Sequence, residues 1–160
     1  MTDVSARADD LTHLGVQRLL AAYADAVTRY AWHELEDLFL SSATVVVETG
    51  RGEPVRLAGP IEVGDFIAGA LERFEFFEMV PLNHVVLVDA GGVHGRCYIH
   101  ELRQERDGGP RSDAFGLYED RYERDDDRWR FAERRYRSLA RGGERLDIVS
   151  FAGEGTTEAT

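Results

Sequence analysis

The sequence of 160 residues, 43% of them hydrophobic, has the length and composition of one soluble domain that buries its own core. A formal net charge of −11 argues against nucleic acid as a partner, because a polyanion would be repelled. All 19 basic residues are arginine, which excludes Schiff-base chemistry and a lysine general base.

Targeting and cofactor signals are missing from the sequence. No apolar run approaches the roughly 20 residues needed to span a bilayer, and the first ten residues lack the basic and apolar regions of a signal peptide. The single cysteine, Cys97, cannot form an internal disulfide. The five histidines show no metal-ligand spacing, and there is no glycine-rich phosphate loop. We therefore expect a cytoplasmic protein without membrane contact, metal or other cofactor.

Three helices are predicted in the first half of the chain. Apolar residues recur at three- and four-residue steps over residues 11–30, and Asp9 or Asp10 can cap the long amphipathic helix that this spacing predicts. A second helix is expected over residues 33–40, and Gly59-Pro60 opens a third. The inner face of the third helix is expected to carry Ile61, Ile67, Ala70, Leu71 and Phe74.

Strands are predicted between and after these helices. β-Branched residues predict a strand over residues 43–48, a turn over 50–54 and a weak partner strand over 55–58. Four further strands are expected from Asn83 to about Leu139. They are separated by turns at residues 89–92, 107–110 and 125–128. The whole is expected to form one domain over residues 1–153, and the polar residues 154–160 a disordered tail.

Alternation along the later strands predicts which side chains face inward. Tyr118 and Asp120 share one face of their strand, and Leu117 lies on the other. On the next strand Trp129 and Phe131 mark the interior face, so the same alternation places Glu133 and Arg135 inside. Outward-facing Phe115, Leu117 and Tyr136 would leave an apolar sheet surface, from which we expect a homodimer through the open face of the sheet.

Five motifs follow one another at characteristic spacings. They are Leu19-x3-Tyr23, Trp32-His33-x-Leu35-x3-Phe39, Asn83-His84-Val85-Val86, Gly116-Leu117-Tyr118-Glu119-Asp120 and Asp127-Arg128-Trp129-Arg130-Phe131-x3-Arg135. Together with the element order they resemble the SnoaL-like branch of the NTF2-like superfamily, which contains scytalone dehydratase and related dehydratases, isomerases and cyclases. The resemblance covers roughly Leu11 to Leu139. It implies an α+β cone, in which a curved mixed or antiparallel sheet wraps around three N-terminal helices and leaves an apolar cavity.

The resemblance also implies a class of chemistry. Its members act without a cofactor on apolar, ring-bearing metabolites, so we expect a dehydratase, isomerase or cyclase for a polyketide- or terpenoid-like compound of secondary metabolism, with epoxide hydrolysis as a variant. Active members commonly carry an aspartate five residues after the tyrosine, where it pairs with the strand histidine. That position is Thr28 here, and the next frequent acidic position is Ala31. The alternative is therefore a non-catalytic small-molecule-binding or dimerisation module that lost the pair.

Seven residues are the candidates for such a site. His84 is the candidate for proton transfer, because imidazole titrates near neutral pH. Tyr23 could donate a hydrogen bond to a substrate oxygen, and Asp120 could replace the missing carboxylate or form a structural ion pair with an arginine. The candidates for substrate binding are Tyr118, Arg135, Thr28 and Trp32. For Arg135 an ion pair with Glu133, Asp120 or Glu101 is the other interpretation, and for Trp32 it is packing.

Overall fold

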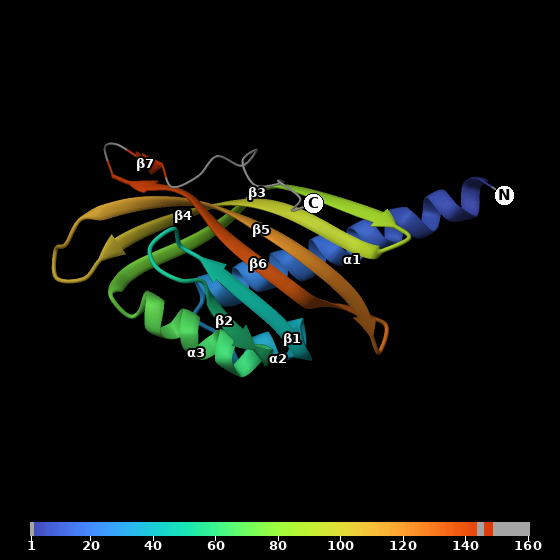
Figure 1. Ribbon diagram of the computed structural model, residues 1–160, viewed down its shortest axis with the longest axis horizontal. Coiled ribbons are helices and arrows are strands. Elements are labelled where there is room, and N and C mark those ends of the chain that lie inside the picture. The colour runs from blue at the N-terminus through green and yellow to red at the C-terminus, as the bar shows by residue number, and fades with distance from the viewer. Residues whose placement is uncertain (1, 144–145, 149–160) are drawn as a thin grey trace.

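The computed structural model describes residues 2–143 and 146–148, and its helices lie against one curved sheet (Figure 1). The helices are α1 (Thr2–Thr28), the 3-10 turn η1 (Trp32–Glu34), α2 (Leu35–Leu38) and α3 (Gly59–Leu71). The strands are β1 (Phe39–Glu48), β2 (Val55–Ala58), β3 (Phe74–Asp89), β4 (Gly92–Glu105), β5 (Arg111–Asp125), β6 (Arg128–Gly142) and β7 (Leu146–Ile148). The predicted α+β cone is thereby confirmed, whereas the predicted tail over residues 154–160 lies outside the described residues.

The sheet is mixed. Its strands run in the order β2-β1-β6-β5-β4-β3, and β7 pairs with β6 at one end. The β1–β6 pairing is parallel and the others are antiparallel. The three predicted turns connect β3 through β6, and two of them place Asp107, Asp126 and Asp127 at positive φ values of 58°, 46° and 65°. Aspartate tolerates this left-handed conformation better than most residues, which explains the turn sequences.

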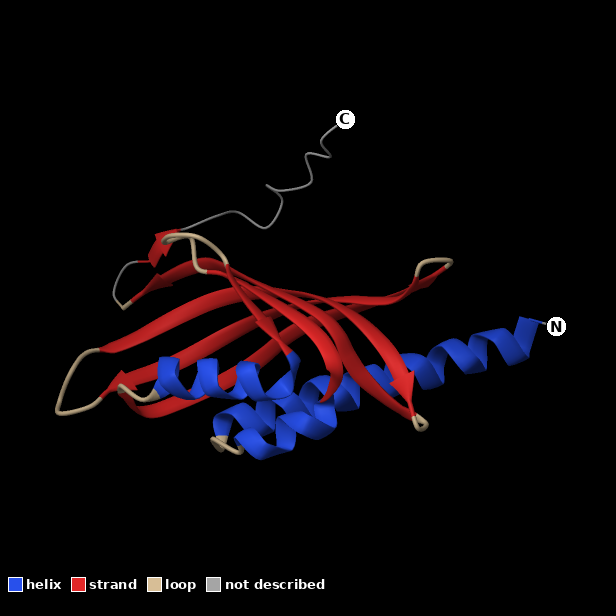
Figure 2. Ribbon diagram, turned by 60° about the horizontal axis from the view of Figure 1, so that its bottom comes forward, coloured by secondary structure: helices blue, strands red, loops and turns tan. Residues whose placement is uncertain are grey.

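Helices α1 and α3 lie on the concave side of the sheet, as Figure 2 shows. The apolar face of α1 supplies Val16, which is fully buried in the core together with Phe39 and Phe131 of the sheet. Gly15 of α1 leaves room for the side chain of Trp129 on β6, because a Cβ atom at Gly15 would lie 2.4 Å from Cδ1 of Trp129. The sheet and α1 therefore share one core, and α3 covers the remaining part of the concave face.

A β-bulge in β6 overturns one sequence prediction. Arg121 pairs with Glu133 but Tyr122 pairs with Phe131, so Ala132 is an extra residue on β6. An extra residue exchanges the two faces for everything that follows it. The prediction that Glu133 and Arg135 face inward is therefore wrong, since both side chains are exposed and Arg134 is buried instead.

The same bulge changes the surface that was expected to form a dimer. Tyr136 lies on the cavity side rather than outside, and Leu117 is only 1% exposed. The bulge thus removes Tyr136 from the expected apolar open face, whereas Leu117 stays opposite Tyr118 on β5 but adds almost no exposed apolar surface. The homodimer itself stays a prediction. On α3, Ile61 is 67% exposed rather than turned inward, and Phe74 is buried as the first residue of β3.

Among the helices that the structure describes, none has both the length and the apolar character that crossing a bilayer requires.

Candidate active site

A cavity of about 220 Å³ lies between the sheet, α1 and α3. Most of its wall is apolar and comes from Val45 and Val47 of β1, Phe66 and Ile67 of α3, and Phe77 of β3. Its polar lining consists of Tyr23, Thr49, Arg73, Glu101, Arg103, Tyr118, Arg134, Tyr136 and Arg141. An apolar enclosure with a few converging polar groups is the usual composition of a small-molecule site.

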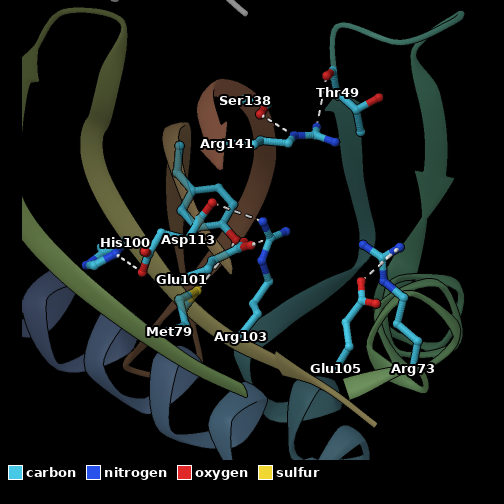
Figure 3. A network of polar contacts seen from close by, with 11 residues as sticks. Thr49, Arg73, Met79, His100, Glu101, Arg103, Glu105, Asp113, Ser138 and Arg141 are labelled. Atoms are coloured by element: carbon cyan, nitrogen blue, oxygen red, sulfur yellow. Dashed lines mark hydrogen bonds and ion pairs between the residues drawn. The ribbon is translucent and has the colours of Figure 1, made fainter. Parts of the chain in front are cut away.

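Glu101 is the one carboxylate among the described residues that line this cavity. Its side chain is 17% exposed, and its Oε2 lies 3.8 Å from Nη1 of Arg103, too far for a hydrogen bond (Figure 3). Burial raises the pKa of Glu101, and the nearby positive charges of Arg103 and Arg141 oppose this only in part. A carboxylate with a raised pKa in an apolar cavity accepts a proton more readily than an ordinary glutamate and can return it later.

Two tyrosine hydroxyls lie in the same lining. Tyr118 is 6% exposed, and its hydroxyl donates to Sδ of Met79 at 3.7 Å and lies 3.4 Å from the hydroxyl of Tyr23. Burial raises the pKa of Tyr118 well above its ordinary value and also raises the pKa of Tyr136. Both phenols therefore stay protonated and can donate hydrogen bonds to an oxygen atom in the cavity.

Arg134 links the cavity to a buried polar chain. Its Nε and Nη2 donate to the two carboxylate oxygens of Asp120 at 2.7 and 2.8 Å, and both side chains are at most 1% exposed. The guanidinium carbon lies 4.2 Å from the ring centre of Tyr23 and 3.9 Å from that of Tyr118. Its Nη1 is buried without a hydrogen-bond partner among the described residues. Arg134 is thus a buried cation packed against the rings of the two tyrosines, with one donor that makes no hydrogen bond.

His84 lies at the far end of this chain. Tyr122 donates to Oδ2 of Asp120 at 3.1 Å, and its hydroxyl lies 3.1 Å from Nε2 of His84. Pro81 pairs with Ile99 and His84 with Cys97, so an irregularity in β3 sets the position of the histidine. His84 is half-buried and does not belong to the described cavity lining. Burial lowers its pKa, against the attraction of the Asp120 carboxylate.

The other predicted site residues lie apart from the cavity. Arg135 is on the outer face of the sheet, where its Nη2 lies 2.7 Å from Oε1 of Glu48. Thr28 accepts a hydrogen bond at its Oγ1 from the backbone N–H of Met79 at 3.2 Å. Trp32 packs edge-on against Tyr30, with ring centres 5.5 Å apart. The structure therefore brings together Tyr23, Tyr118 and Asp120 around Arg134, and joins His84 to them only through Tyr122.

The sequence prediction missed Glu101 and Arg103, although a signal for them exists. Cys97 and Ile99 are buried on β4, and alternation continues their face to Glu101 and Arg103. A polar residue that continues an apolar face is a candidate for a cavity lining. Arg134 carried no such signal, because the bulge at Ala132 determines its direction.

A metal centre has no support in the described part of the chain, where no group of three or more histidine, cysteine or acidic side chains could hold an ion.

Comparison with curated proteins gives no match, whereas solved structures share the fold. A protein of Novosphingobium aromaticivorans assigned as a scytalone dehydratase has a TM-score of 0.74 and 16% identity, over 97% of this chain and 99% of that one. The protein LinA has a TM-score of 0.72 and 21% identity, over 96% of both chains. The hexachlorocyclohexane dehydrochlorinase LinA-type3 of Novosphingobium barchaimii has a TM-score of 0.70 and 20% identity, over 89% of this chain and 92% of that one.

Family membership follows from the sequence itself. Residues 11–135 match the SnoaL-like domain family, a span that runs from α1 into β6 and includes most of the cavity lining. The five motifs quoted above fall within the same span. The chain therefore belongs to the SnoaL-like domain family.

Proposed function

We propose that this protein is a cofactor-independent lyase or isomerase that moves a proton on a small, largely apolar, ring-bearing metabolite held in the cavity. The observation that carries the proposal is Glu101, a mostly buried carboxyl group with a raised pKa in an apolar enclosure. Two of the structural relatives, a dehydratase and a dehydrochlorinase, are named for eliminations, which fits the same class. A polyketide- or terpenoid-like substrate of secondary metabolism belongs to this proposal.

The proposed reaction uses three groups of the cavity lining. The Glu101 carboxylate takes a proton from a carbon next to a carbonyl group, and the electron pair of the broken C–H bond moves onto the carbonyl oxygen. Tyr118 turns its hydroxyl from Sδ of Met79 and donates a hydrogen bond to that oxygen, and the positive charge of Arg134, 3.9 Å from the Tyr118 ring centre, stabilises the negative charge that develops there. Glu101 then returns the proton to another carbon in an isomerisation, or to a departing hydroxyl group in a dehydration.

His84 has an indirect place in this proposal. It is outside the cavity lining and reaches Arg134 through Tyr122 and Asp120. We therefore propose that His84 helps to position the Asp120–Arg134 pair and does not contact the substrate. In the competing proposal His84 itself transfers the proton, as the sequence resemblance implies.

Carbon acidity provides a test that does not need the natural substrate. The protein in D₂O would be incubated with a panel of cyclic ketones and β-hydroxyketones, and proton NMR would follow deuterium entry and loss of the hydroxyl group. Glu101→Gln should lower the rate by about 10²–10⁴-fold, the usual contribution of a positioned acid–base group. Glu78→Gln, an exposed glutamate on β3, is the matched control and should leave the rate unchanged.

Three outcomes separate the alternatives. Loss of exchange in His84→Gln but not in Glu101→Gln would replace Glu101 by His84 as the base. Saturable binding of the panel without exchange in the wild-type protein would favour the non-catalytic binding module. Exchange that survives in both variants would reject the cavity as the site of reaction.

A further inference from the structure

Two of the four arginines in the cavity lining, Arg103 and Arg141, donate their hydrogen bonds to neutral groups. Nη2 of Arg103 donates to the backbone carbonyl of Asp113 at 3.1 Å. Arg141 donates through Nη2 to the backbone carbonyl of Thr49 at 2.9 Å and through Nε to Oγ of Ser138 at 3.0 Å (Figure 3). Carbonyl and hydroxyl oxygens fix the direction of a guanidinium group but do not neutralise its charge.

Negative charge near these arginines is scarce. Glu101 lies 3.8 Å from Arg103. The carboxylate of Asp113 is directed to His100, with Oδ1 at 3.0 Å from Nε2. Glu101 is therefore the one carboxylate in the described lining, and it faces both Arg103 and Arg141.

Arg103 is the more unusual of the two arginines. Its side chain is 11% exposed, and its Nε is buried without a hydrogen-bond partner among the described residues. A buried donor without a partner and a buried charge that is only partly compensated are both unfavourable in a folded protein. Arg103 therefore keeps a positive charge in the cavity lining that Glu101, 3.8 Å away, compensates only in part, and an anionic ligand would complete that compensation.

The apolar part of the cavity wall limits the size and polarity of an anionic ligand. Aliphatic and aromatic side chains of β1, β3 and α3 make up most of the lining, and the volume of about 220 Å³ is below the range of drug-sized pockets. Arg73 also lines the cavity, but its side chain is 66% exposed and its Nη1 lies 4.0 Å from Oε1 of Glu105, so its charge is already paired. A nucleotide or a sugar phosphate is too large and too polar for this enclosure.

We propose that the cavity binds a small apolar carboxylic acid as its anion, with the carboxylate between Arg103 and Arg141 and the hydrocarbon body against the apolar wall. This inference rests on the proposed function, because it names the substrate class of the same site.

Binding of two probes of equal shape tests the inference. Titration calorimetry would compare cyclohexanecarboxylate with cyclohexanecarboxamide at low salt, using the wild-type protein and the variants Arg103→Met, Arg141→Met and Arg56→Met. Arg56 is an exposed residue of β2 outside the cavity lining and serves as the control. In the wild-type protein the acid should bind about ten- to a hundred-fold more tightly than the amide.

Each cavity variant should lose that preference while keeping its affinity for the amide, and Arg56→Met should keep both. Arg103→Met should fold, since it removes a partly compensated buried charge, and circular dichroism would check this. If it does not fold, Arg141→Met alone decides. Equal binding of acid and amide, no saturable binding of the acid, or an equal preference in Arg141→Met and Arg56→Met would overturn the inference.

The result is distinguishable from a failure of the proposed function. Exchange of neutral ketones together with equal binding of both probes would retain the proton-transfer chemistry and reject the carboxylate site. Selective binding of the acid without any deuterium exchange would retain the carboxylate site and reject the chemistry.

Discussion

Two arginine–carboxylate pairs in this protein differ in almost every physical respect. Asp120 and Arg134 are joined by two hydrogen bonds of 2.7 and 2.8 Å and are closed off from solvent. Glu101 and Arg103 approach only to 3.8 Å at the side of a cavity and keep 17% and 11% exposure. Both oxygens of the Asp120 carboxylate accept hydrogen bonds, which makes this the saturated pair, whereas no hydrogen bond joins Glu101 and Arg103.

The difference separates a pair that stabilises the fold from a pair that can interact with a ligand. A guanidinium–carboxylate pair joined by two hydrogen bonds has a fixed geometry. Its donors and acceptors are already used, apart from the buried Nη1 of Arg134. A loose pair beside an apolar cavity leaves its charges and donors available. The first pair should therefore control stability, and the second should control binding and proton transfer.

The largest expected effect is on the saturated pair. Asp120→Asn leaves the Arg134 charge buried without its counter-charge and should lower the free energy of unfolding by about 3–5 kcal/mol. Urea denaturation would measure it. The double variant Asp120→Leu/Arg134→Met removes both charges and should recover most of the loss, and an Asp120→Asn protein as stable as the wild type would contradict the assignment.

Glu101→Gln should act in the opposite direction on stability. Because burial raises the pKa of Glu101 in the folded state, the stability that its neutral form contributes is full below the unfolded pKa and is lost as pH rises through the folded pKa. The variant has no such loss, so its advantage over the wild type should grow with pH. The difference approaches about 1.4 kcal/mol for each unit by which the two pKa values differ. Thermal unfolding from pH 4 to 8 would measure this difference. If the stability of the wild-type protein rose relative to that of the variant as pH increased, the assignment would be refuted.

His84 should give a smaller effect at acid pH. Its pKa is lowered from 6.5, first by burial and further by the charges of Arg134 and His13, so the folded state favours the neutral ring. That contribution is present above the unfolded pKa and is lost as pH falls below about 6.5 toward the folded value. His84→Gln should therefore flatten the melting temperature between pH 5 and 7, and an unchanged slope would show that the ring is solvated.

The smallest effect concerns Arg135. Its ion pair with Glu48 is on the outer face, and its side chain is 55% exposed. Arg135→Gln should change the free energy of unfolding by at most about 1 kcal/mol and leave deuterium exchange intact. Urea denaturation beside the exchange assay would measure both. A loss of exchange here would return Arg135 to the site that the sequence predicted.

Local chemistry made the turns and part of the core predictable. The aspartate- and glycine-rich turns, the short β2 over residues 55–58 and the inward face of Tyr118 and Asp120 depend on neighbouring residues only, and all three are confirmed. The face of β6 was not predictable, because one extra residue at Ala132 reverses the alternation without a signal in the sequence.

The candidate site was predictable in part. Tyr23 and Tyr118 line the cavity as expected, since they continue apolar faces of α1 and β5. Glu101 could have been found by the same alternation along β4, but it was considered only as an ion-pair partner. His84 could not be placed from the sequence, because the irregularity between Pro81 and His84 sets its direction.

The central claim is that Glu101, and not the saturated pair, carries the proton-transfer chemistry. Carbon-13 NMR titration of the side-chain carboxyl groups measures its pKa directly, and the signal that disappears in Glu101→Gln identifies the residue. We predict a midpoint above the ordinary glutamate value of 4.5. A midpoint at or below 4.5 would mean that Glu101 is an ordinary ion-pair partner of Arg103, and would contradict the account.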